Sequence, residues 1–68
     1  MVNLMRLKAE ISKRGQTIEA LSKAIGMDDS TFYRKMNAQG KTFTLEQVDA
    51  IKRALDLDSK TAEAIFFS

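Results

Sequence analysis

Residues 17–37, TIEALSKAIGMDDSTFYRKMN, decide the predicted fold. Apolar residues recur at helical spacing on both sides of Gly26, and this pattern predicts two short helices joined by a tight turn. Thr17 can cap the first helix and Asp28 the second, because their side-chain oxygens accept hydrogen bonds from backbone N–H groups at a helix start. Glycine turns sharply at no steric cost, which suits Gly26 to the break between the helices.

Three more helices are predicted around this stretch. Each follows a residue that can cap it, namely Asn3, Thr44 and Asp58, and Thr44…Gln47 has the spacing of a capping box. Gly15 is expected to end the first helix in the left-handed conformation. The apolar residues predicted to line the buried faces are Leu4, Leu7, Ile11, Ile18, Leu21, Ala24, Ile25, Phe32, Met36, Leu45, Val48, Ile51, Leu55, Ala62, Ile65 and Phe66. The sequence therefore predicts an all-α fold, a compact five-helix domain that occupies residues 1–68 and has no strands.

The composition excludes several classes of function. The chain has 68 residues without cysteine or histidine, which removes disulfides, thiolate metal sites and histidine-based acid–base catalysis. We therefore expect no cofactor, no metal and no enzymatic activity. Eleven basic and nine acidic side chains give a formal charge of +2, which permits nucleic-acid binding through a local patch without requiring it. No apolar run approaches the roughly 20 residues that span a bilayer, and no secretory signal is visible, so a cytoplasmic location is expected.

Residues 17–37 also meet the packing demands of a helix-turn-helix, a motif that places its second helix in the DNA major groove. The two helices must cross closely, which requires a small residue at the crossing and a glycine in the turn. Ser22 and Gly26 lie at those positions, and apolar side chains at the required offsets would hold the pair at a fixed angle.

The whole chain resembles the phage repressor and Cro family of small helical DNA-binding domains. The resemblance is carried by residues 17–37, the loop GKTFT, the segment LEQVDAIKRALDL and the closing SKTAEAIFF. It implies a lambda-repressor-like domain of five helices that binds operator DNA as a homodimer and regulates transcription. It further implies that the third helix reads base edges through Asp29, Ser30, Tyr33 and Arg34. The phosphate contacts that it implies are Thr17, Lys41 and Thr42.

The chemistry of these side chains fits the roles. Arg34 can form a bidentate contact to guanine, and Ser30 can donate to a base or a phosphate. Tyr33 can stack, touch a thymine methyl group or donate to phosphate; alternatively it is a half-buried core residue. Asn37 can bond to DNA or cap its own helix. Lys35, Asn37, Lys23 and Arg14 are further candidates for phosphate contacts, which set affinity and its salt dependence. Alternatively, Lys23 is solvated surface, the usual place of a lysine.

Two features depart from the family pattern. Lys35 stands where an apolar residue is usual, and Met36 takes over its packing. Asp28 and Asp29 bring negative charge to the DNA-facing helix terminus. Asp28 has a role as a cap. Asp29 could accept a hydrogen bond from cytosine N4, or it could repel phosphate and disfavour non-specific binding.

Residues 65–67, Ile-Phe-Phe, suggest a partner chain because one helical face buries only part of such a run. Phe67, with Phe66, could form a homodimer contact suited to two half-sites about 34 Å apart. Alternatively, Ile65 and Phe66 complete the core and Phe67 folds back over it.

The sequence thus favours a phage-type transcriptional regulator, a Cro-like repressor that binds double-stranded operator DNA at the nucleoid of a bacterial host. The alternative is a protein-binding module on the same fold, an antirepressor or a modulator that pairs with another regulatory protein.

Overall fold

The computed structural model describes residues 2–38 and 43–67 and confirms the all-α prediction. Five helices follow one another along the chain, and no strand occurs within these ranges. The helices are α1 (Leu4–Lys13), α2 (Ile18–Ala24), α3 (Asp29–Asn37), α4 (Leu45–Ala54) and α5 (Ser59–Phe66).

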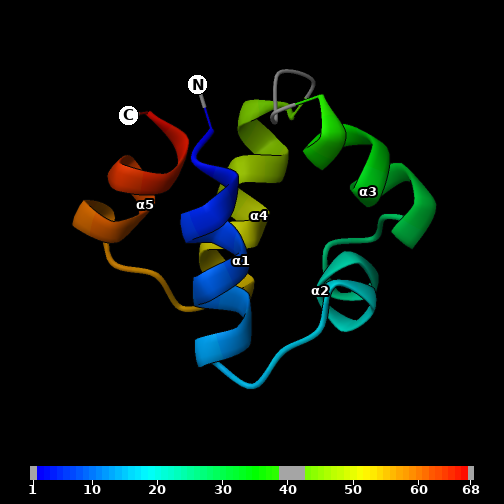
Figure 1. Ribbon diagram of the computed structural model, residues 1–68, viewed down its shortest axis with the longest axis horizontal. Helices are drawn as coiled ribbons and strands as arrows, with labels where there is room; N and C mark the ends of the chain where they lie inside the picture. The colour runs from blue at the N-terminus through cyan, green and yellow to red at the C-terminus, as the bar shows by residue number, and fades with distance from the viewer. Residues whose placement is uncertain (1, 39–42, 68) are drawn as a thin grey trace.

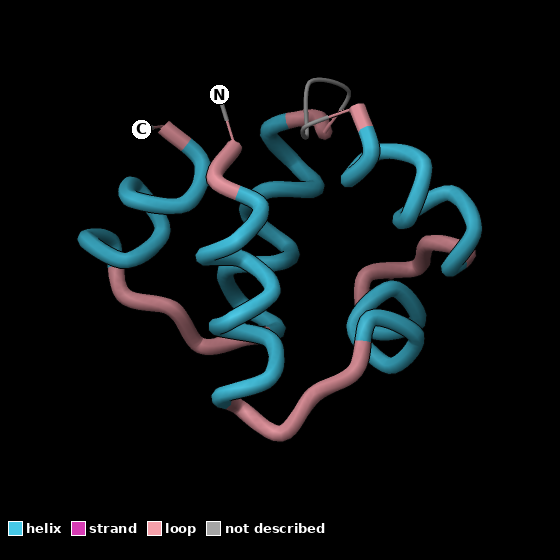
Figure 2. Tube along the Cα trace, viewed as in Figure 1, coloured by secondary structure: helices cyan, strands magenta, loops and turns pink. Residues whose placement is uncertain are grey.

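The helices surround a central core. In Figure 1, α5 lies at one end of the longest molecular axis and α2 with α3 at the other, while α1 and α4 occupy the middle. Figure 2 shows the short connections between them, and both chain ends emerge on the same side. Helix α2 packs on α3 and α4, and α1 packs on α5. A backbone hydrogen bond from Asn3 N to Ile65 O, 2.7 Å long, ties the start of the chain to α5.

The buried apolar side chains form one cluster drawn from all five helices. Phe32 has no exposed surface, and its ring meets that of Phe43 edge-on with centroids 5.4 Å apart. The other members are Leu7, Ile11, Leu21, Met36, Ile51, Leu55, Leu57, Ala62, Ile65 and Phe66. Burial of these side chains is the dominant force that holds such short helices together, because isolated helices of this length are marginal in water.

Four of the predicted caps form as expected. The side chains of Asn3, Thr17, Thr44 and Asp58 each accept a hydrogen bond from the backbone N–H three residues later. Thr44 and Gln47 form the full capping box. Asp28 is different: it occupies the N-cap position with extended backbone, but its side chain makes no capping bond.

Among the described residues, three helices are followed by a residue in the left-handed conformation. Gly15 and Gly26 have φ of 68° and 72° after α1 and α2, and Asp56 has φ of 53° after α4. Each is followed by a backbone N–H that reaches back to a carbonyl five residues earlier, as in Gln16 N to Ile11 O at 3.0 Å. Together these bonds form Schellman caps, which satisfy the last carbonyls of each helix. Gly15 was predicted in this role, whereas Asp56 was placed only within a break between helices.

The structure corrects two expected core residues: Ala24, the last residue of α2, is exposed, and so is Leu45. Leu45 was predicted on the buried face of α4, but 77% of it is exposed. It is the first residue of α4 and lines the rim of a surface groove against α5, so it lies beyond the edge of the core. Ile51 and Leu55, further along the same helix, are buried as predicted.

Candidate nucleic-acid interface

The crossing of α2 and α3 has the close packing that the sequence predicts. Ser22 is 1% exposed, and its hydroxyl donates to the carbonyl oxygen of Glu19 at 3.0 Å. Leu21 of α2 and Phe32 of α3 are both buried in the core cluster. Met27 N donates to Ser22 O at 2.8 Å across the turn at Gly26. The angle between the two helices is therefore fixed by a small buried residue, a left-handed glycine and large apolar neighbours.

This packing decides which face of α3 points outward. Phe32 and Met36 point into the core, as the spacing of four residues predicts. The four residues expected to read bases lie on the exposed remainder of the helix: Asp29, Ser30, Tyr33 and Arg34. Tyr33 is 42% exposed and lies outside the buried cluster, so it is partly covered but is not a core residue. The outer face of α3 thus carries two hydroxyl groups, one guanidinium and one carboxylate, which can all hydrogen-bond to base edges or phosphates.

Tyr33 is linked to α2. Its hydroxyl donates to Glu19 Oε2 at 3.3 Å. The pKa of the Tyr33 phenol is raised above its usual value, first by the negative charge of Glu19, then by partial burial, the hydrogen bond to Glu19 and the charge of Asp29. The phenol therefore stays protonated and remains the donor of this bond. Sequence reasoning did not identify Glu19, because only the fold brings it beside α3.

The start of α3 is acidic and internally bonded. Ser30 Oγ donates to Asp28 Oδ2 at 2.6 Å, which explains why Asp28 does not cap the backbone. Asp28, Asp29 and Glu19 line a shallow depression between α2 and α3. The three carboxylates lie beside the expected reading surface, where they oppose the approach of phosphates. Within the described residues, no group of His, Cys, Asp or Glu is arranged to hold a metal ion.

The structure describes three of the five residues expected to contact phosphates. Thr17 is exposed and accepts from Ala20 N at 3.0 Å, which leaves its own proton able to donate. Asn37 is exposed at the end of α3, and Lys35 is half-buried on the same helix. Lys41 and Thr42 lie outside the described residues.

Arg14 does not serve as a free cation. It forms an ion pair with Glu10, and its Nε donates to the carbonyl oxygen of Leu55 at the end of α4. Glu10 is only 8% exposed. Arg14 thus satisfies a helix C-terminus, a site at which positive charge is stabilising. Two of its donors are therefore directed at the protein, and a phosphate contact by Arg14 stays a prediction.

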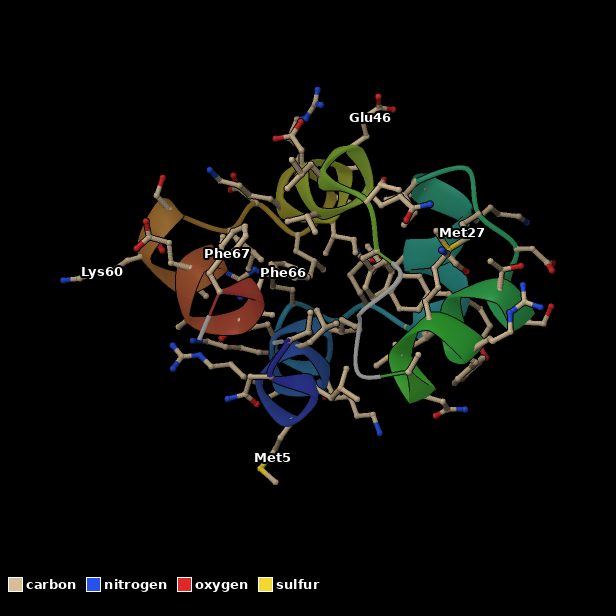
Figure 3. All side chains as sticks on the ribbon, turned by 90° about the horizontal axis from the view of Figure 1, so that it is seen from above. Met5, Met27, Glu46, Lys60, Phe66 and Phe67 are labelled. Carbon is tan, nitrogen blue, oxygen red and sulfur yellow. The ribbon has the colours of Figure 1, made fainter. Side chains whose placement is uncertain are left out.

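The two phenylalanines expected at a dimer contact differ in exposure. Phe66 is 4% exposed and Ile65 has no exposed surface, so both complete the core. Phe67 is 63% exposed and does not fold back over the core. In Figure 3, Phe67 lies on the side of α5 that faces α4, while Met5 points away from the molecule. Phe67 and Leu45 line a groove between α4 and α5, with Val48 and Ala62 also contributing.

A comparison with family models decides the relationship of the chain. The model of the Cro/C1-type helix-turn-helix DNA-binding domain matches residues 6–61. The chain belongs to this family. The match spans α1 to the first turn of α5, and so covers the helix pair described above. Searches with this chain found no match among curated proteins and none among solved structures. In the part of the chain that the structure describes, no helix is long and apolar enough to cross a membrane.

Proposed function

We propose that this Cro/C1-type domain is a phage-type transcriptional regulator, a Cro-like repressor that binds operator DNA with α3 in the major groove. The observation that carries the proposal is the family match over a helix pair whose second helix has an exposed, hydrogen-bonding outer face. All 68 residues would act as one domain. In a bacterial host, such a protein would work at the nucleoid.

The roles we propose follow from the chemistry of each group. Arg34 reads guanine, because its planar guanidinium matches the two acceptors at the major-groove edge of that base. Tyr33 packs its ring against thymine methyl groups while its hydroxyl donates to Glu19. Asp29 accepts from cytosine N4, a contact that replaces repulsion by a specific hydrogen bond. Thr17, Lys35 and Asn37 contact phosphates, as do Lys41 and Thr42.

We further propose that the regulator binds as a homodimer through the groove between α4 and α5. Leu45 and Phe67 are large apolar side chains, largely exposed, and line the same groove. The molecule measures 27 Å along its longest axis, and α5 and α3 lie at opposite ends of that axis (Figure 1). Half-sites one helical turn apart require each α3 to lie about 17 Å from the twofold axis. A contact at the α5 end meets this requirement and leaves both copies of α3 free.

A protein-binding module is the second candidate. The same groove favours it, because exposed apolar side chains are typical of protein contacts, and the carboxylates beside α3 disfavour DNA. In that case the occupant of the groove would be another regulatory protein rather than a second copy.

Selection of bound sequences from random DNA tests the two candidates. If the protein binds operator DNA, the selected site should have two related halves one helical turn apart. Its affinity for that site should fall steeply with salt concentration, because phosphate contacts release counterions. Failure to enrich any sequence, or binding that does not respond to salt, would contradict the DNA-binding proposal. Sedimentation of the protein alone and with the selected site gives the number of copies bound.

A further inference from the structure

Glu19 connects the two helices of the helix-turn-helix on their outer surface. It is exposed in the first turn of α2, and its Oε2 accepts from the hydroxyl of Tyr33, the fifth residue of α3. The bonds of the neighbouring α3 side chains stay local: Ser30 donates to Asp28, and Arg34 donates to Thr31. Of the side chains expected to read bases, Tyr33 is therefore the one whose polar end is hydrogen-bonded to α2.

A tyrosine held in this way has a definite orientation before DNA arrives. Its side chain has only two rotatable bonds, and the hydrogen bond to Glu19 restricts both. Fixing a contact residue in advance lowers the entropy lost on binding, which favours complexes that use the residue. Non-specific complexes depend on phosphate contacts and gain little from an oriented ring.

We propose that Glu19 is a positioning residue of the DNA-binding surface, which orients Tyr33 toward the groove and so raises the preference for operator over other DNA. The inference rests on the proposed function, because it requires that α3 faces DNA. Glu19 also affects affinity in general. Its carboxylate, with those of Asp28 and Asp29 in the same depression, opposes phosphate approach in every complex. This repulsion weakens binding to all DNA and leaves the ratio between operator and other DNA unchanged.

The contact between Glu19 and Tyr33 can be measured without DNA. Tyr33 is the single tyrosine of a chain without tryptophan, so the ultraviolet absorbance of tyrosinate reports its ionisation directly. Glu19 is the first cause of the raised pKa of Tyr33. Glu19→Gln and Glu19→Ala should both lower that pKa toward its usual value. Glu46→Gln is the matched control, since Glu46 is also acidic and in a first helical turn but lies on α4 (Figure 3). An unchanged Tyr33 titration in both Glu19 variants would overturn the proposal.

Binding measurements then test the role. The probes are the site selected from random DNA and a scrambled duplex of equal length. Glu19→Ala should reduce the ratio of the two affinities roughly threefold, an effect expected of one modest hydrogen bond. Glu19→Gln keeps an acceptor oxygen and should retain most of the ratio, although it binds both duplexes more tightly. Glu46→Gln should leave the ratio unchanged.

A double-mutant cycle shows whether Glu19 acts through Tyr33. Tyr33→Phe should lower the ratio about as much as Glu19→Ala, and the double variant should lose no more than either single variant. Independent, multiplying losses would overturn the positioning role. If wild type prefers the selected site over the scrambled duplex and no Glu19 variant changes that preference, this inference alone is overturned. A wild-type protein that binds both duplexes equally would overturn the proposed function together with it.

Discussion

The left-handed residue after α4 offers a sharp test of how the helix ends stabilise the fold. Asp56 has φ of 53°, a conformation that costs an L-residue about 1–2 kcal/mol, and somewhat less for aspartate. Glycine adopts it freely but gives up about 0.5–1 kcal/mol of backbone entropy on folding. Asp56→Gly should therefore stabilise the protein by about 0.5–1 kcal/mol, which for a domain of this size raises Tm by about 2–8 °C.

Two controls separate conformation from charge. Asp56→Asn removes the negative charge from the C-terminal end of α4 but keeps the side-chain shape, so the further gain of glycine over asparagine is conformational. Gly15→Ala makes the opposite change at φ of 68°, and nothing lies within 4 Å of the added Cβ. It should destabilise by about 1 kcal/mol through backbone strain alone.

Circular dichroism during thermal and urea unfolding gives the Tm and the free energy of unfolding of wild type and the three variants. Asp56→Gly should be more stable than wild type, and Gly15→Ala should be less stable. Loss of stability in Asp56→Gly, with a normal helix content, would refute the argument that a left-handed backbone limits the C-terminus of α4.

Three further predictions concern charge and association. The pKa of Asp58 is lowered, chiefly by the hydrogen bond from the Thr61 backbone N–H, so its capping contribution is present above the unfolded pKa and lost as pH falls through the folded pKa. In Asp58→Ala, the free energy of unfolding should fall less steeply with decreasing pH between the unfolded and the folded pKa of Asp58. An unchanged pH dependence would contradict the capping role of Asp58. Arg14→Met should destabilise by about 1.5–3 kcal/mol in urea unfolding, because it leaves Glu10 without its partner; a neutral effect would show that the pair contributes no net stability. Phe67→Glu should shift sedimentation toward monomer, whereas the matched change Met5→Glu, at a side chain 83% exposed and pointing away from the molecule, should not; equal behaviour would remove the groove from the dimer.

Local signals explain what the sequence predicted well. A cap needs one side chain and a backbone N–H three residues later, so Asn3, Thr17, Thr44 and Asp58 could be identified from spacing alone. Gly15 and Gly26 mark left-handed ends because glycine favours that conformation. Asp56 adopts it without glycine, and no sequence signal distinguished it from an ordinary loop residue.

The features that sequence reasoning missed depend on distant parts of the chain. Arg14 is drawn to a carbonyl at Leu55, 41 positions away, and Glu10 is buried with it. Leu45 is exposed because it begins α4 beyond the edge of the core, and the periodicity of α4 does not show where the core ends. Glu19 meets Tyr33 only because α2 packs against α3 in the fold. The candidate site was therefore predictable along one helix but not between helices.

The central claim, that the outer face of α3 reads the operator, is tested most directly by selecting DNA sites with the wild-type protein and with Arg34→Ala in parallel. Both proteins should enrich a two-part site, and the variant should lose the preference for guanine at one symmetric position in each half. Its affinity for the wild-type site should fall about 5- to 150-fold, the equivalent of one bidentate contact, while its affinity for scrambled DNA falls much less. Identical selected sites, or an equal loss on both duplexes, would contradict base reading by α3.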